Sequence, residues 1–142
     1  MTFKRFNVLL VDDCEEDIDL LKHALLESGM TIDLSVAANG EDALMKLNVE
    51  ERDYPDLILL DLNMPRINGH EVLKRIKHHD RLKKIPVIIL TTSRSPDDIL
   101  KCYNDYSNCY VCKPLDFDSY HSVVEKIREF WLELVVLPTG AR

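Results

Sequence analysis

The sequence contains little glycine and no long apolar run. It has 4 glycines and 6 prolines among 142 residues, too few for a fibrous chain or a disordered, low-complexity one. No stretch approaches the ~20 consecutive apolar residues of a membrane-spanning helix, and residues 1–5 do not have the form of a signal peptide. We therefore expect a globular cytoplasmic protein that does not associate with a membrane.

Positive charge and cysteine are also scarce. The 18 Lys and Arg against 25 Asp and Glu leave a formal net charge of −7. Nucleic acids and anionic membranes bind clustered positive charge, so neither is an expected partner. The 4 cysteines are too few and too irregularly spaced for a disulfide scaffold, which favours a reducing compartment. Cys109 and Cys112 form a C-x-x-C pair, but residues three apart on a strand face opposite sides, so we expect no metal or redox site there.

Short apolar runs alternate with helical patterns along a chain of about one domain's length. Strands are predicted over 6–11, 34–37, 57–60, 87–90 and 110–111. Three of these runs are continuously apolar, which is typical of strands buried on both faces of a parallel sheet. Strand–helix alternation with short links implies right-handed crossovers and helices on both faces. The sequence therefore predicts an α/β fold, a flavodoxin-like, doubly wound five-stranded parallel sheet of order 2-1-3-4-5 in a single domain.

Distinctive polar residues follow four of the five predicted strands. Asp12 and Asp13 follow the first strand, Asp61 the third, Thr91 the fourth and Lys113 the fifth. In open α/β sheets, ligands bind beyond the carboxyl ends of the strands, and the predicted order makes the first and third strands neighbours. Each residue alone has an ordinary explanation, such as a turn or a helix cap. Their joint placement on one edge is what predicts a site.

Carboxylates crowded at one edge need a counter-charge. Two of them about 4 Å apart repel by ~4 kcal/mol at an effective dielectric of 20, and three must take up protons or recruit a cation. Oxygen ligands at a site open to water suit Mg²⁺. We expect Asp13 and Asp61 to bind Mg²⁺ directly and Asp12 to bind it directly or through water. A backbone carbonyl just past Asp61 could complete the set, and that of Asn63 is within reach.

The same edge has the groups needed to handle phosphate. Mg²⁺, the Lys113 ammonium and the Thr91 hydroxyl together would clamp three phosphoryl oxygens, with Asp61 in line as the nucleophile. The predicted chemistry is transfer of a phosphoryl group to Asp61, which gives an acyl phosphate that water later hydrolyses.

These motifs resemble the receiver domains of two-component response regulators. Val11-Asp12-Asp13 is similar to the family's acidic pair, and the segment 60–65, continuing to Gly69, is similar to the stretch around its phosphorylated aspartate. Thr91 stands where the family has its switch hydroxyl, and Lys113-Pro114 resembles its lysine–proline pair. The resemblance covers residues 7–128, nearly the whole chain.

The resemblance implies a phosphoacceptor switch and not an enzyme, with Mg²⁺-dependent self-phosphorylation and slow self-dephosphorylation. Asp61 would take its phosphoryl group from a histidine kinase, and Lys113 would pair with a phosphoryl oxygen. The family also implies a cis bond between Lys113 and Pro114, a conformation that only proline makes accessible at low cost. Thr91 would move towards the phosphoryl group and Tyr110 would follow it inward, so that the signal leaves by protein–protein association.

Residues 1–129 are therefore expected to form the receiver, and residues 130–142 a C-terminal extension. The extension begins with Phe130-Trp131-Leu132 and resembles that of the stand-alone regulators paired with cyanobacterial phytochromes, which implies a phytochrome as the partner kinase. Its apolar residues cannot all face one core from a single helix, so a homodimer is predicted. The residues expected at the dimer contact are Phe130, Trp131, Leu134 and Val135. The alternative is a tail that folds back over its own sheet edge.

Three other functions fit the sequence less well than the switch. An aspartyl-phosphate phosphatase would need a general acid two residues after the nucleophile, where this chain has Asn63. A flavin or nucleotide module would need a glycine-rich loop after the first strand, and none is present. A pseudo-receiver would bind partners without phosphorylation. The presence of Asp12, Asp13 and Asp61 argues against that function.

Overall fold

A computed structural model describes residues 5–138 of the chain. Its sheet is parallel throughout and has the order β2-β1-β3-β4-β5, as the sequence predicted. The strands are β1 (Arg5–Val11), β2 (Thr31–Ala37), β3 (Leu57–Leu60), β4 (Val87–Thr91) and β5 (Cys109–Cys112).

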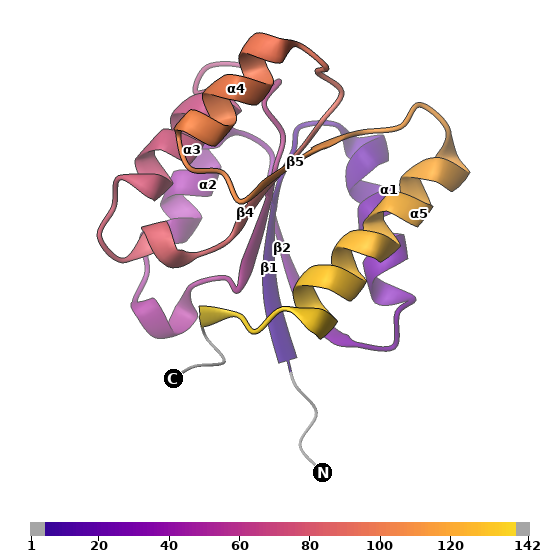
Figure 1. Cartoon of the computed structure of the whole chain (residues 1–142). Coiled ribbons are helices and arrows are strands. Elements are labelled where there is room, and N and C mark those ends of the chain that lie inside the picture. Colours follow the sequence, from indigo (N-terminus) through magenta and orange to yellow (C-terminus); the bar gives the residue numbers. More distant parts are fainter. Residues whose placement is uncertain (1–4, 139–142) are drawn as a thin grey trace.

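Helices cover both faces of this sheet (Figure 1). On one face lie α1 (Glu15–Leu26) and α5 (Phe117–Arg128). On the other lie α2 (Gly40–Leu47), α3 (Gly69–Lys77) and α4 (Pro96–Asn104). Two 3₁₀ turns, η1 (Glu51–Asp53) and η2 (Leu82–Lys84), lie in connections, and a π-helical segment, η3 (Glu129–Leu134), continues α5. The fold is the predicted doubly wound, flavodoxin-like one.

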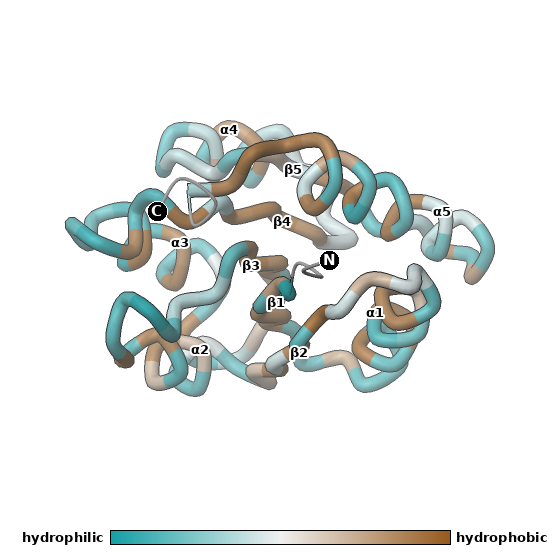
Figure 2. The backbone as a smooth tube through the Cα atoms, turned by 90° about the horizontal axis from the view of Figure 1, so that it is seen from below, coloured by the Kyte–Doolittle hydropathy of each residue, from teal (hydrophilic) through white to brown (hydrophobic). Residues whose placement is uncertain are grey.

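Alternation along the strands divides the core into two layers. Val8 and Leu10 of β1 belong to the cluster beneath α1 and α5, whereas Leu9 and Val11 belong to the cluster beneath α2 and α3. Figure 2 shows the apolar strands between these helical layers. Strands buried on both faces need apolar residues at every position, and all four residues of β3 are buried.

Polar caps start four of the helices where loops leave the sheet. The side chains of Asn39, Asn68, Ser95 and Asp116 each accept a hydrogen bond from the backbone N–H three residues later. Such a bond satisfies an amide that has no partner within its helix. These caps fix the loops at the carboxyl edge of the sheet where each one enters its helix.

The C-terminal segment contacts the core of its own chain in part. Leu132 and Leu137 are buried in the cluster beneath α1 and α5, and Trp131 and Val135 pack against that cluster. Figure 1 shows the segment at the end of the sheet where the strands begin. The remaining large apolar side chains are exposed: Phe130, Leu134 and Val136. Residues 139–142 of the predicted extension lie outside the described part of the chain.

Candidate functional site

The three predicted metal-binding carboxylates share one pocket at the carboxyl edge. Val11 of β1 is in register with Leu60 of β3, so the residues that follow them, Asp12 and Asp61, become neighbours. Both are buried, while Asp13 is exposed at the rim. One carboxylate oxygen from each of the three lies within 4.8 Å of the others.

Backbone amides orient the two buried carboxylates. The Cys14 N–H donates to Asp12 Oδ1 at 2.9 Å, and the Asn63 N–H donates to Asp61 Oδ1 at 3.3 Å. Each amide lies two residues after the carboxylate, in the Asx-type local bond that aspartate forms in turns. In both residues the second oxygen, Oδ2, faces Lys113.

Lys113 enters the pocket from the end of β5 and is buried. Its backbone N–H donates to the Thr91 carbonyl at 2.7 Å, which holds the residue beside β4. Its Nζ lies 2.7 Å from Asp12 Oδ2 and 3.4 Å from Asp61 Oδ2. A third carboxylate, that of Asp17 on α1, lies 2.9 Å from the same Nζ.

Burial and charge act in opposition on these groups. Burial raises the pKa of Asp12, and the hydrogen bond from Lys113 offsets this only in part. Burial alone would lower the pKa of Lys113, but hydrogen bonds to Asp12 and Asp17 and the charge of Asp61 raise it above its usual value. Lys113 is therefore a charged ammonium that forms ion pairs with three carboxylates. The carboxylate of Asp13 lies beside them. The pocket is short of positive charge, and its oxygen donors fit a hard divalent cation.

Thr91 closes the pocket on the side of β4. Its side chain is buried, and its Oγ1 accepts from Asn63 Nδ2 and from the Ser93 N–H, both at 3.4 Å. The Tyr110 hydroxyl donates to the Ser93 carbonyl at 2.9 Å, with its ring half-buried against the core. Thr91 and Tyr110, the two predicted switch residues, are thus connected through Ser93.

The chain that forms this site also matches a known protein family along most of its length. The family model of the response regulator receiver domain matches residues 8–125. The chain belongs to the response-regulator receiver family.

Two relatives are similar to this chain over most of their own length. Response regulator Rcp1 of Synechocystis sp. is 39% identical over 137 residues, which cover 94% of this chain and 93% of Rcp1. The probable methanogenesis regulatory protein FilR2 of Methanothrix harundinacea is 41% identical over 130 residues, which cover 89% of this chain and 84% of FilR2.

Solved structures extend the likeness beyond the family model. The crystal structure of the phosphorylated cyanobacterial phytochrome response regulator RcpA matches with a TM-score of 0.90 and 37% identity, over 95% of this chain and 99% of RcpA. The Mn²⁺-bound form of Rcp1 matches with a TM-score of 0.88 and 38% identity, over 94% of this chain and 99% of that structure. The receiver is thus related to phytochrome response regulators over nearly its whole length.

The expected cis bond is wrong for this receiver. No peptide bond among residues 5–138 is cis, so Lys113–Pro114 is trans, the isomer that X–Pro bonds favour by about 0.5–1 kcal/mol. Cys109 of the C-x-x-C pair packs with the cluster beneath α1 and α5. Cys112 instead approaches the Ser93 carbonyl, with its Sγ at 3.6 Å.

Asp17 is a site residue that the motif analysis missed. It stands four residues before the buried Leu21, so it continues the inward stripe of α1 towards the sheet edge. That spacing was visible in the sequence. The spacing does not single out Asp17, because other acidic residues surround it in the first turn of α1.

A polar network beside Thr91 was also missed. The Ser93 hydroxyl donates to Asp98 Oδ2 at 2.5 Å, and His70 Nε2 lies 3.0 Å from Asp98 Oδ1. These hydrogen bonds lower the pKa of Asp98. The network joins the start of α3 to the start of α4, a tertiary pairing that has no signature in sequence spacing.

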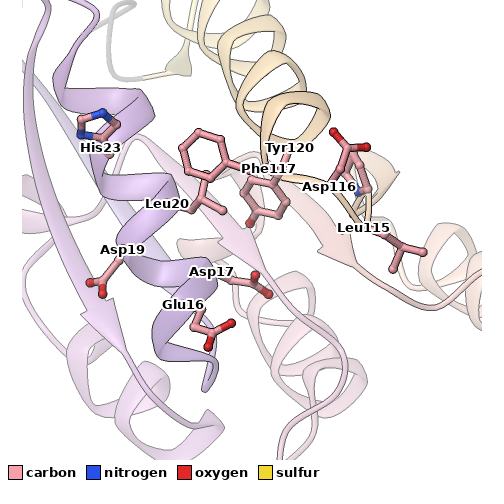
Figure 3. A pocket seen from close by; sticks show the side chains of 10 residues that line it. Glu16, Asp17, Asp19, Leu20, His23, Leu115, Asp116, Phe117 and Tyr120 are labelled. Atoms are coloured by element: carbon pink, nitrogen blue, oxygen red, sulfur yellow. The ribbon is translucent and has the colours of Figure 1, made fainter.

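A cleft of about 760 Å³ between α1 and α5 opens beside the acidic pocket. Figure 3 shows Asp17 and Glu16 on its α1 side, with Phe117 and Tyr120 on its α5 side. Asp17 therefore lies between the cleft and Lys113.

Proposed function

We propose that this receiver accepts a phosphoryl group on Asp61 from the phosphohistidine of a kinase. A carboxylate oxygen of Asp61 would attack phosphorus, the P–N bond would break, and the electron pair would leave with the imidazole. The observation that carries the proposal is the buried Lys113 ammonium 3.4 Å from Asp61 Oδ2. The relation to phytochrome response regulators, one of them solved in phosphorylated form, supports a phytochrome as the partner kinase.

The metal in this proposal is Mg²⁺. The carboxylates of Asp12, Asp13 and Asp61 and the backbone carbonyl of Asn63 would hold it. Their all-oxygen chemistry fits a hard cation, and the Mn²⁺-bound form of the related Rcp1 supports a divalent ion. When bound, Mg²⁺ would supply positive charge against the phosphoryl oxygens.

Lys113 and Thr91 are proposed to bind the remaining phosphoryl oxygens. Lys113 needs to turn one N–H from a carboxylate to a phosphoryl oxygen, and the buried Thr91 hydroxyl would donate to another. Movement of Thr91 would pull on Ser93, whose carbonyl accepts from Tyr110. The signal would thereby reach α4, β5 and α5, and the receiver would act through association with other proteins and not as an enzyme.

A homodimer is part of the proposal. Phe130 and Trp131 line an apolar hollow of about 660 Å³, together with Cys109, Val111, Val123 and Ile127. Leu134 is exposed at the end of η3, and half-buried Val135 follows it in the chain. We propose Phe130, Trp131, Leu134 and Val135 as the contact, within an extension that begins at residue 130.

The direct test is the intact mass of the protein after incubation with acetyl phosphate and Mg²⁺. The wild type should gain one phosphoryl group, and Asp61→Asn should gain none because its side chain lacks the nucleophilic oxygen. Asp80→Asn, an exposed change, should label like the wild type. Chelation of the metal should stop labelling. Undiminished labelling of Asp61→Asn would refute the acceptor, and labelling in chelator would refute the metal's role.

A further inference from the structure

The contact between Lys113 and Asp17 has no part in the chemistry described so far. Neither metal binding nor phosphoryl binding requires Asp17, yet its Oδ2 lies 2.9 Å from Lys113 Nζ. This distance is shorter than the 3.4 Å between Nζ and Asp61 Oδ2. The lysine therefore interacts more closely with α1 than with the proposed acceptor.

An ammonium has three N–H donors, and in this site all three have carboxylate partners. Asp12, Asp17 and Asp61 each take one. A phosphoryl group on Asp61 can gain a bond from Lys113 only if one of these bonds is released. The cost of that release therefore enters the barrier to phosphoryl transfer.

Asp17 differs from the other two partners in its exposure. The side chains of Asp12 and Asp61 are 1% and 7% exposed, whereas that of Asp17 is 25% exposed and lines the α1–α5 cleft. Asp17 lies at the α1 side of this cleft (Figure 3), so solvent that enters the cleft can solvate its carboxylate once Lys113 leaves it. Release of Asp12 would leave a buried carboxylate without its partner, so of the two shorter bonds to Lys113 the one to Asp17 costs less to break.

We propose that Asp17 is a positioning residue that restrains Lys113 and so slows its engagement with a phosphoryl group on Asp61. The inference rests on the proposed role of Asp61 and adds a restraint from α1. In the resting receiver, Asp17 and Asp12 hold the ammonium on the α1 side of the pocket. Phosphoryl transfer requires the Asp17 bond to break and the freed N–H to turn to a phosphoryl oxygen.

The test compares Asp17→Asn with Glu16→Gln in phosphorylation by acetyl phosphate at saturating Mg²⁺. Both variants lose one negative charge from the first turn of α1 and from the lining of the same cleft. Glu16 is exposed and is not among the carboxylates that bind Lys113. Changes in the general field and in the helix dipole therefore affect both variants alike.

We expect Asp17→Asn to label about tenfold faster than wild type, the factor that one hydrogen bond to a charged group supports. Glu16→Gln should stay within about twofold of wild type, as expected for an exposed charge. An unchanged or slower rate for Asp17→Asn would overturn the restraint, and so would an equal acceleration in Glu16→Gln. Asp17→Ser, which also lacks the carboxylate, should repeat the acceleration if Asn perturbs folding.

A spectroscopic measurement reads the contact without phosphorylation. In protein labelled with ¹⁵Nζ-lysine, the Lys113 ammonium signal should shift in Asp17→Asn and stay in place in Glu16→Gln. An unmoved signal in Asp17→Asn would show that the bond is absent in solution. If the wild type accepted no phosphate, the proposed function would fail, yet this signal would still decide whether Asp17 holds Lys113.

Discussion

Burial disfavours the charged form of two side chains of this receiver, but only one of them stays neutral. Lys113 is buried but remains charged, because carboxylates from α1 and from the loops after β1 and β3 surround it. Cys102 of α4 is buried among apolar residues. Burial, with the charges of Asp98 and Asp105, raises the pKa of the Cys102 thiol from 9.0 to about 12. The thiol therefore stays protonated and unreactive in the folded receiver.

The raised pKa of Cys102 predicts a loss of stability in alkali. Above about pH 9 the thiol ionises in the unfolded chain but not in the folded one, so the unfolded state binds fewer protons. The free energy of unfolding should then fall by up to about 1.4 kcal/mol per pH unit until the folded thiol itself ionises near pH 12. Cys102→Ala lacks this group and should lose less stability over the same range.

Denaturant unfolding of wild type and Cys102→Ala, measured from about pH 8 to about pH 10, checks this. The variant should start less stable, because it leaves a small cavity, and the difference should narrow as the pH rises. Other alkaline groups titrate in both proteins and cancel from the comparison. A difference that stays constant with pH would contradict the raised pKa.

At the scale of elements, buried strands were predictable and exposed edges were not. Residues 57–60 match β3 in full, because a strand buried on both faces is apolar at every position. The edge strand β2 starts at Thr31, three residues before the predicted start. Its burial alternates irregularly, and only pairing with β1 reveals those residues as strand.

Within the site, the residues at strand ends were predictable and those on helices were not. Asp12, Asp13, Asp61, Thr91 and Lys113 could be placed together because strand order alone brings strand ends together. Asp17 and the pair of His70 and Asp98 depend on how helices dock on the sheet. Spacing places Asp17 on the inward face of α1, but the docking of a helix on the sheet is set by tertiary packing, which residue spacing does not give.

Gly69 shows how one helix start determines the geometry of the acceptor. A Cβ at this position would meet the Asp61 carbonyl oxygen and would lie 2.6 Å from Leu62 Cα. Backbone cannot yield as a flexible side chain does, so Gly69→Ala should push α3 away from the loop that follows β3. We expect a loss of about 1–3 kcal/mol in stability and slower phosphorylation, because Asp61 would be displaced.

Gly29→Ala is the matched control for Gly69→Ala. Gly29 has φ +77° and open space around the added Cβ, so the change strains the backbone far from the acidic pocket. It should lower the melting temperature but leave the rate of phosphorylation by acetyl phosphate unchanged. Equal rates in the two glycine variants would show that α3 does not position Asp61 through this contact.

At the scale of the whole molecule, the apolar surface formed by the C-terminal segment is only partly covered by the rest of the chain. The tail buries Leu132 and Leu137 in its own core, so the tail that folds back on its own chain and the dimer contact are both compatible with the structure. Removal of residues 130–142 would therefore disturb the core as well as any interface. A substitution at an exposed apolar position separates the two effects.

Leu134→Asp is that substitution, because Leu134 is 71% exposed and a charge there leaves the core intact. In a two-fold symmetric dimer the change occurs twice. Loss of two leucine contacts of at least about 1.5 kcal/mol each should weaken dimerisation about a hundredfold or more. Met45→Asp on α2, 73% exposed and on the opposite face of the sheet, should leave the dimer unchanged. Sedimentation velocity should then show monomer for Leu134→Asp alone, and an intact dimer in that variant would place the interface elsewhere.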